Sequence, residues 1–361
     1  MLYKYQFVKH QKLRELHFHF LFFMRKVKNV TKSAKFTPSI FFHDSFLTNG
    51  KIAPKGRENK QLHNRFKAFF DVYKKLDKDK KIEFYELIIF SQDIHKFFED
   101  ISIIEIKKIQ SPNIKTLLNN SDVFNQLMDA MWNYLKSPNA WEIDKHYEVF
   151  YNNLPDSKMC PFCGMNKISD KDLYRSDYDH IAYKAEFPIS SIDLKNITPS
   201  CSECNTKFKT TKNVFYAFND ASRSQYCYPY TFKSAYIDLS ISFDLVGSLF
   251  PNTDLANING NWKITINPNN DTTKTWDEIY NIEKRYVKLL NVNYLQWNEE
   301  LVIGCNKFID IDSLKSRINE FKKGFNPNKL RIEYHIKYAY YDFLEKSMND
   351  ILFNQINSMI A

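Results

Sequence analysis

Four of the six cysteines in this 361-residue chain form two Cys-x-x-Cys pairs. The first pair is Cys160 and Cys163, followed directly by Gly164, and the second pair is Cys201 and Cys204. Two thiolates separated by two residues supply two corners of a tetrahedron, so the pairs together predict a closed four-sulfur Zn²⁺ site. A zinc ion in such a site has no open coordination position, which makes its expected role structural.

Residues that can bind a metal ion or move a proton lie between the two pairs and directly after them. Asp179 and His180 are adjacent, Asn196 lies 16 residues after His180, and Asn205 directly follows the last cysteine. Each residue alone has a simpler explanation, because Asp-His pairs and single asparagines commonly occupy turns and helix caps. Inside a frame of two cysteine pairs, their joint occurrence favours a catalytic site over a zinc ribbon that only binds.

These residues, in this order, resemble the HNH endonucleases of the ββα-metal superfamily, in the group whose hairpin and helix are clasped by two Cys-x-x-Cys pairs. The resemblance covers about residues 158–212. It implies a first strand that ends in Asp179 and His180, a returning strand that carries Asn196, and a helix that opens with Asn205.

The resemblance also implies a role for each of these residues. Asp179 and Asn205 would bind one catalytic divalent ion, Mg²⁺ or Mn²⁺, through oxygen ligands. His180 would act as the general base that takes a proton from water, and the resulting hydroxide would attack the scissile phosphorus. Asn196 would take no part in the chemistry, but would hold the histidine-bearing loop in place.

Three lysines are predicted to contact phosphates of a bound nucleic acid. Lys207 and Lys209 lie just inside the expected helix, and Lys184 lies four residues after His180. Many relatives have Pro-Lys at that last position, where this chain has Tyr183-Lys184. The geometry of the loop after the histidine is therefore expected to differ.

Helices are expected upstream of the first cysteine pair. Apolar residues at three- and four-residue spacing predict helices over 62–76 and 123–135, and a further helix is expected over 141–154. The segment 77–83 begins with alternating acids, but it lacks the glycine and glutamate that a calcium-binding loop needs. We therefore expect a solvated turn there.

Strands and further helices are expected downstream. Alternating apolar and polar residues over 237–245 and 262–266 predict two paired strands. Thr275-x-x-Glu278 has the pattern of a capping box, which predicts a helix that starts there and continues through Leu289. Later helices are expected over 314–321 and 332–344.

The expected fold class is α+β. A ββα-metal HNH core with a four-cysteine zinc site would be embedded between mostly helical N- and C-terminal regions, with a short β-hairpin after the core. The expected domains are a basic arm and helical domain over 1–154, a zinc-stapled nuclease domain over 155–232, and a hairpin with helices over 233–361.

The formal charge of +9 is concentrated near the start of the chain. Residues 1–38 hold nine Lys and Arg against one acid, Glu15, so this arm would either meet phosphates, an acidic partner or an anionic surface, or remain a solvated tail. No apolar stretch approaches the length that crosses a bilayer, and the short run Phe20–Met24 lacks a cleavage site for secretion. We expect a cytoplasmic protein without membrane contact.

The expected function is metal-dependent cleavage of DNA. Residues 160–215 carry eight Lys and Arg against seven acids, so a partner protein is expected to deliver substrate. The resemblance implies that this partner is an ATPase or a sensor subunit, and it associates such proteins with antiviral defence in bacteria. Two alternatives stay open, namely a non-catalytic zinc-stabilised nucleic-acid-binding or scaffold protein, and an HNH enzyme that cuts RNA.

Overall fold

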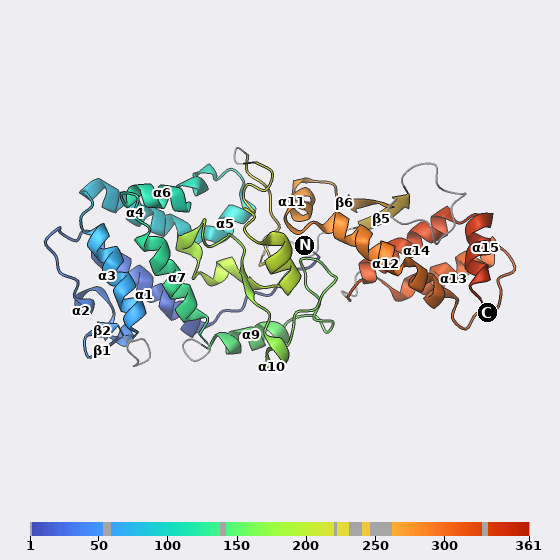
Figure 1. The fold of residues 1–361 in the computed structure, drawn as a ribbon, viewed down its shortest axis with the longest axis horizontal. Helices are drawn as coiled ribbons and strands as arrows, with labels where there is room; N and C mark the ends of the chain where they lie inside the picture. Colours follow the sequence, from blue (N-terminus) through green and yellow to red (C-terminus); the bar gives the residue numbers. More distant parts are fainter. Residues whose placement is uncertain are drawn as a thin grey trace.

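The chain folds mainly into helices, with three two-stranded antiparallel sheets among the residues that the structure describes. Figure 1 shows an elongated molecule, with N-terminal helices at one end, C-terminal helices at the other and the cysteine-containing segment between them. No described helix combines the length and the apolar character needed to cross a membrane. The computed structural model describes residues 2–52, 59–137, 142–219, 222–230, 240–245, 262–326 and 331–360.

The basic N-terminal arm is largely a packed helix, α1 (Gln11–Val27). Its apolar residues recur at helical spacing and bury one face, while Arg25 and Lys26 lie in the last turn, where the helix dipole favours cations. The interpretation of this segment as a solvated tail is therefore wrong. The buried residues of α1 are Leu13, Leu16, His19, Phe20, Phe23, Met24 and Val27.

Residues before α1 pack against the centre of the molecule. The backbone N–H of Leu2 donates to the carbonyl of Pro161 at 2.8 Å, and the hydroxyl of Tyr5 donates to the carbonyl of Pro199 at 2.9 Å. The start of the chain is thus part of the same core as the cysteine-containing segment.

Helix α4 (Lys78–Phe90) begins where we expected a solvated turn. The side chain of Asp77 accepts a hydrogen bond from the backbone N–H of Lys80 at 2.9 Å, so the alternating acids mark a helix N-cap. Helix α7 (Val123–Leu135) has the bounds expected from its apolar stripe. The other N-terminal helices and strands are α2 (Pro38–Phe41), η1 (Asp44–Phe46), β1 (Leu47–Thr48), β2 (Lys51–Ile52), α3 (Lys60–Tyr73), η3 (Ser91–Asp93), α5 (Ile94–Glu99), η4 (Ile104–Ile109), α6 (Ser111–Leu117) and α9 (Ile143–Asn152).

A short hairpin and a wide helical turn form the central part. Strand β3 (Tyr178–His180) pairs antiparallel with β4 (Ile197–Pro199), so that His180 lies opposite Ile197. The helix that follows, η7 (Glu203–Lys209), is a π-helix where an ordinary helix was expected. Short helices precede and connect these strands, namely α10 (Lys171–Tyr174), η5 (Pro188–Ser190) and η6 (Leu194–Asn196).

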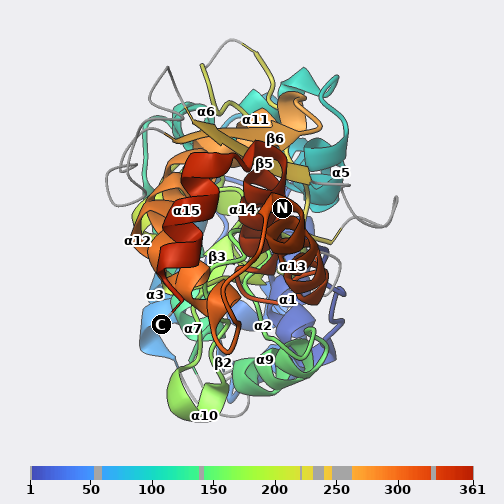
Figure 2. The ribbon, with the colours of Figure 1, turned by 90° about the vertical axis from the view of Figure 1, so that its right-hand side faces the viewer.

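The C-terminal part is a hairpin packed on helices. Strand β5 (Ser240–Leu245) pairs antiparallel with β6 (Trp262–Asn267), which confirms the expected pairing, while residues 237–239 and the connecting loop lie outside the described residues. Figure 2 looks onto this end, where β5 packs on α14 and β6 packs on α12. The helices are α11 (Asp271–Tyr280), α12 (Ile282–Val302), α13 (Ile311–Gly324), α14 (Tyr334–Ser347) and α15 (Asp350–Ser358).

The capping box expected at Thr275 is wrong. Helix α11 starts at Asp271, and its capping box joins Asn270 and Thr273, whose side chains each bond the backbone of the other. Thr275 is fully buried inside the helix, so its hydroxyl is not at a helix start. The continuous helix that we expected is also divided, because Asn281 takes a left-handed conformation with φ of 54° between α11 and α12.

The observed start of helix α11 can be tested by substitution. We expect Asn270→Ala to lower the free energy of unfolding by about 1 kcal/mol, because the backbone N–H of Thr273 loses its acceptor. Glu278→Ala, which the sequence pattern would place in the box, should change it by less than about 0.5 kcal/mol. Denaturant unfolding of both variants measures the two effects. A larger loss of stability in Glu278→Ala than in Asn270→Ala would contradict a helix start at Asp271.

Candidate active site and metal centre

The four paired cysteines form one buried cluster. The Sγ atoms of Cys160, Cys163, Cys201 and Cys204 all lie within 4.8 Å of one another. Four sulfurs around a zinc ion at about 2.3 Å would lie about 3.8 Å apart, and the Sγ atoms of Cys163 and Cys201 are 3.9 Å apart. The predicted four-sulfur site is therefore present as a cluster that can hold a metal such as Zn²⁺.

A tight turn shapes the first cysteine pair. The backbone N–H of Gly164 donates to the carbonyl of Cys160 at 2.8 Å, and the N–H of Met165 points at the Sγ of Cys163 at 3.5 Å. Gly164 has a φ of +69°, in the left-handed region that favours glycine. An N–H directed at a sulfur stabilises the thiolate that a metal requires.

Two segments that are far apart in the sequence lie against this turn. A Cβ atom added to Gly164 would lie 2.3 Å from the Cδ1 of Leu2 and 2.4 Å from the Cε1 of His335. The ring of His335 is itself fixed, since its Nε2 lies 2.8 Å from the hydroxyl of Tyr286. Gly164 is thus required both for its backbone conformation and for the close approach of two other segments.

Substitution of two glycines distinguishes the effect of backbone conformation from the effect of crowding. Gly164→Ala should lower the free energy of unfolding by more than about 2 kcal/mol, because it combines backbone strain with crowding. Gly304→Ala is the matched control, since Gly304 has a similar φ of +72° but open space around the added Cβ. The control should lose only about 1 kcal/mol in the same unfolding measurement. Equal losses would contradict the crowding described at Gly164.

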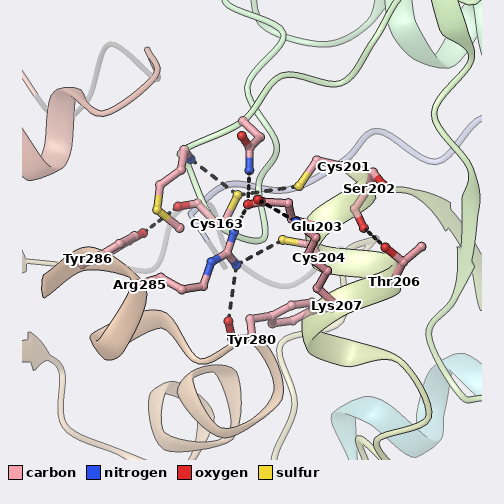
Figure 3. Close-up of polar contacts among 12 residues, drawn as sticks. Cys163, Cys201, Ser202, Glu203, Cys204, Thr206, Lys207, Tyr280, Arg285 and Tyr286 are labelled. Atoms are coloured by element: carbon pink, nitrogen blue, oxygen red, sulfur yellow. Dashed lines mark hydrogen bonds and ion pairs between the residues drawn. The ribbon is translucent and has the colours of Figure 1, made fainter. Parts of the chain in front are cut away.

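A buried arginine from α12 lies against the second cysteine pair (Figure 3). The guanidinium of Arg285 donates to the Sγ of Cys204 at 3.5 Å and to the carbonyl of Tyr280 at 3.3 Å, and it also pairs with Glu203 at 3.3 Å. Burial disfavours its charge, but the thiolates of Cys204 and Cys163 together raise the pKa of Arg285 above its ordinary value. Arg285 therefore offsets part of the negative charge of the cluster.

The metal content of the protein tests the cluster. We expect one tightly bound Zn²⁺ per chain, measured by elemental analysis after gel filtration. Cys201→Ser should lower this content and reduce the free energy of unfolding by several kcal/mol, since such sites contribute about 10 kcal/mol. Cys227→Ser is the control, because Cys227 is a free, half-buried cysteine outside the cluster. Retention of stability by Cys201→Ser without zinc would contradict a structural metal site.

A second group of candidate side chains lines a pocket of about 270 Å³. Asp179 and His180 enter it from β3, and Asn205 enters it from η7. The three residues that the resemblance assigns to catalysis are thus brought together at one surface. The hairpin and the cysteine cluster position them, because Cys201 follows β4 closely and Cys204 lies within η7.

His180 is buried and oriented. Its Nε2–H donates to the carbonyl of Ser191 at 2.8 Å, which leaves the Nδ1 lone pair as the acceptor. The ring of Trp132 meets the imidazole edge to face, with centroids 4.4 Å apart. Burial lowers the pKa of His180 to about 3, the bond to Ser191 opposes this shift, and nearby lysines add to it. The imidazole is therefore neutral, with its Nδ1 unprotonated.

Asn196 fixes the loop that follows His180. Its Oδ1 accepts from the backbone N–H of Ala182 at 2.7 Å, and its Nδ2 donates to the carbonyls of Ala182 at 3.0 Å and Ser190 at 3.1 Å. Asn196 is fully buried and lies outside the pocket lining. Ser190 is adjacent to Ser191, whose carbonyl accepts the hydrogen bond from His180. Asn196 therefore orients the histidine indirectly, through the loop.

Asp179 offers one free carboxylate oxygen. Its Oδ1 accepts from the Nζ of Lys209 at 2.9 Å, while its Oδ2 is buried without a hydrogen-bond partner among the described residues. Burial raises the pKa of Asp179, and the ammonium of Lys209 opposes this shift. This oxygen and the amide oxygen of Asn205, which lines the same pocket, are a suitable ligand set for a hard divalent cation with additional water ligands.

The chain matches no protein-family model, no curated protein and no solved structure. The function must therefore be inferred from the chemistry of the site.

The three predicted phosphate contacts differ in their placement. Lys209 is only 1% exposed and also donates to the carbonyl of His180 at 2.6 Å, so it supports the site from inside and is not available to flanking phosphates. The wide π-helical turn carries it inward. Lys207 is exposed and lies 3.5 Å from Glu203, away from the pocket lining. Lys184 lines the pocket and forms an ion pair with Asp129.

Several residues of the site were not found from the sequence. Trp132 and Lys136 come from α7 and its C-cap, and Arg175 comes from the segment before β3. The apolar stripe of α7 predicts that helix, but nothing in its pattern shows what the helix packs against. Arg285 likewise lies 81 residues beyond the cysteine it contacts.

Proposed function

We propose that the chain is a metal-dependent endonuclease of the HNH type that hydrolyses phosphodiester bonds of DNA. One observation carries this proposal: a neutral, oriented imidazole, a buried carboxylate with an unpartnered oxygen and an amide side chain line the same pocket. His180, Asp179 and Asn205 are the residues concerned. Water activation by a base beside a divalent cation is the chemistry that such a group supports.

His180 acts as the general base in this mechanism. Its Nδ1 accepts a proton from a water molecule, the hydroxide attacks the phosphorus, and the bond from phosphorus to the leaving oxygen breaks. Burial is the largest cause of the low pKa of His180, and Lys209, Lys184 and Lys136 lower it further. A bound phosphate would offset the charge of these lysines and so raise the pKa of His180.

Asp179 and Asn205 would hold the divalent ion, Mg²⁺ or Mn²⁺, through their side-chain oxygens. When bound, such an ion supplies positive charge that stabilises the phosphoryl group and the leaving oxygen in the transition state. Lys209 contributes by binding Oδ1 of Asp179, which leaves Oδ2 without a hydrogen-bond partner among the described residues.

The cysteine cluster has a supporting role in the proposal. It joins the turn of the first cysteine pair to the end of the hairpin and to the π-helix, so it helps to fix the helix that bears Asn205 relative to the hairpin that bears His180. DNA as the substrate, a partner such as an ATPase or sensor subunit and a role in antiviral defence are supported by the sequence resemblance alone.

Cleavage assays with plasmid DNA and with RNA test the proposal. The intact protein should nick DNA in Mg²⁺ or Mn²⁺, and His180→Ala should reduce the rate at least about 100-fold, because the base is lost. Asn205→Ala should require a higher concentration of the divalent ion. His43→Ala is the control, since His43 is an exposed histidine outside the pocket lining and should leave the rate unchanged.

The other outcomes discriminate between the alternatives. Cleavage of RNA alone would identify an RNA-cutting enzyme with the same site. Equal cleavage by His180→Ala would remove the proposed base. A zinc-containing, folded protein that binds nucleic acid but cuts neither DNA nor RNA would be a non-catalytic binding module, and the nuclease proposal would then be wrong.

A further inference from the structure

One face of helix α7 forms a wall of the pocket. Asp129, Trp132 and Lys136 follow one another at spacings of three and four residues, which places them on the same side of a helix. Trp132 and Lys136 both line the pocket that contains His180. Helix α7 also contacts η5 in the loop after β3, although it ends well before the first cysteine pair.

Two contacts hold α7 in this position. The indole of Trp132 is buried and packs edge to face on the imidazole of His180 at 4.4 Å. Asp129 forms an ion pair with Lys184, which follows β3 in the sequence. Because these contacts lie one and two turns before the end of α7, they also fix the position from which Lys136 extends.

Lys136 differs from the other cations of the pocket because no described acid forms an ion pair with it. Arg175 pairs with Asp144 at 3.1 Å, and Lys184 pairs with Asp129. Lys136 is exposed and forms no ion pair with any residue in the described ranges.

The acids near the pocket do not neutralise Lys136. Asp177 and Asp179 are the carboxylates of the lining, and Asp179 is paired with the buried Lys209. The ion pairs of Arg175 and Lys184 involve exposed carboxylates, and such pairs are weak enough to exchange for a phosphate. A negatively charged group that enters the pocket can therefore bind Lys136 without displacing any carboxylate of the described residues.

We infer that Lys136 binds a backbone phosphate next to the bond being cut, so that helix α7 supplies part of the substrate site. This inference rests on the proposed function and extends it to a region that the sequence motif does not include. An ammonium with three N–H donors suits a phosphate oxygen, and such a contact carries no base preference. The alternative is a solvated lysine that interacts only with the C-terminal end of its helix.

Salt-dependent DNA binding tests this inference. The intact chain carrying His180→Ala is titrated with fluorescein-labelled DNA oligonucleotides, and anisotropy gives the affinity between about 50 and 200 mM salt. Adding Lys136→Ala should reduce the slope of log K against log salt by about one, because one phosphate contact is lost. The affinity should fall about tenfold, as for the loss of one charge-assisted hydrogen bond. Lys136→Arg should restore most of the slope.

Lys323→Ala is the matched control. Lys323 is also an exposed lysine at the C-terminal end of a helix, but α13 lies at the opposite end of the molecule (Figure 1). It should bind DNA with the slope and affinity of the parent. In the wild-type background, Lys136→Ala should raise KM and leave kcat within about twofold, since it removes binding and not the base.

The outcomes separate the inference from the proposed function. An unchanged slope and affinity in Lys136→Ala, or a failure of the parent to bind DNA, would overturn the phosphate contact. Binding with the expected loss of slope, together with no cleavage by the wild-type protein in any divalent metal, would leave the contact standing and reject the nuclease.

Discussion

Four buried thiolates within 4.8 Å of one another repel each other unless a cation lies among them. The centre of the molecule is built around that constraint. Buried apolar residues such as Met159 and Phe162 flank the first pair, and attraction of the sulfurs to a shared metal ion adds to this packing. Arg285 adds a second cation from outside the cluster, which reduces the remaining negative charge and ties α12 to the same point.

The pocket also combines a buried acidic group with a neighbouring cation. Burial of Asp179 disfavours its charged form, and the ammonium of Lys209 at 2.9 Å opposes that effect. Only one carboxylate oxygen takes part in that pair, and the other has no hydrogen-bond partner among the described residues. The imidazole of His180 is fixed by a carbonyl and an indole, and neither group competes for its other nitrogen.

Local patterns in the sequence predicted the parts of the fold that depend on neighbouring residues. The apolar stripe of α7, the pairing of β5 with β6 and the four cysteines all follow from spacing along the chain. Helix α1 was missed because its basic residues dominate the charge count, although its apolar residues bury one face. The start of α11 was misplaced because a pattern that fits a capping box occurs inside the helix.

Contacts between distant segments could not be predicted in this way. The inward direction of Lys209 depends on a π-helical turn, and the position of Lys136 depends on how α7 packs against η5. Neither arrangement leaves a periodic signal in the sequence. The residues named by the motif were therefore found, whereas the side chains that surround them were visible only in three dimensions.

The close approach of Leu2 and His335 to Gly164 joins segments that are synthesised at different times. Residue 2 leaves the ribosome before the cysteine pairs, and residue 335 leaves it after them. The turn around Cys163 therefore gains all of its neighbours only after residue 335 has emerged. A chain that is interrupted between the cysteine pairs and residue 335 exposes a cysteine-rich turn whose surroundings are unfinished.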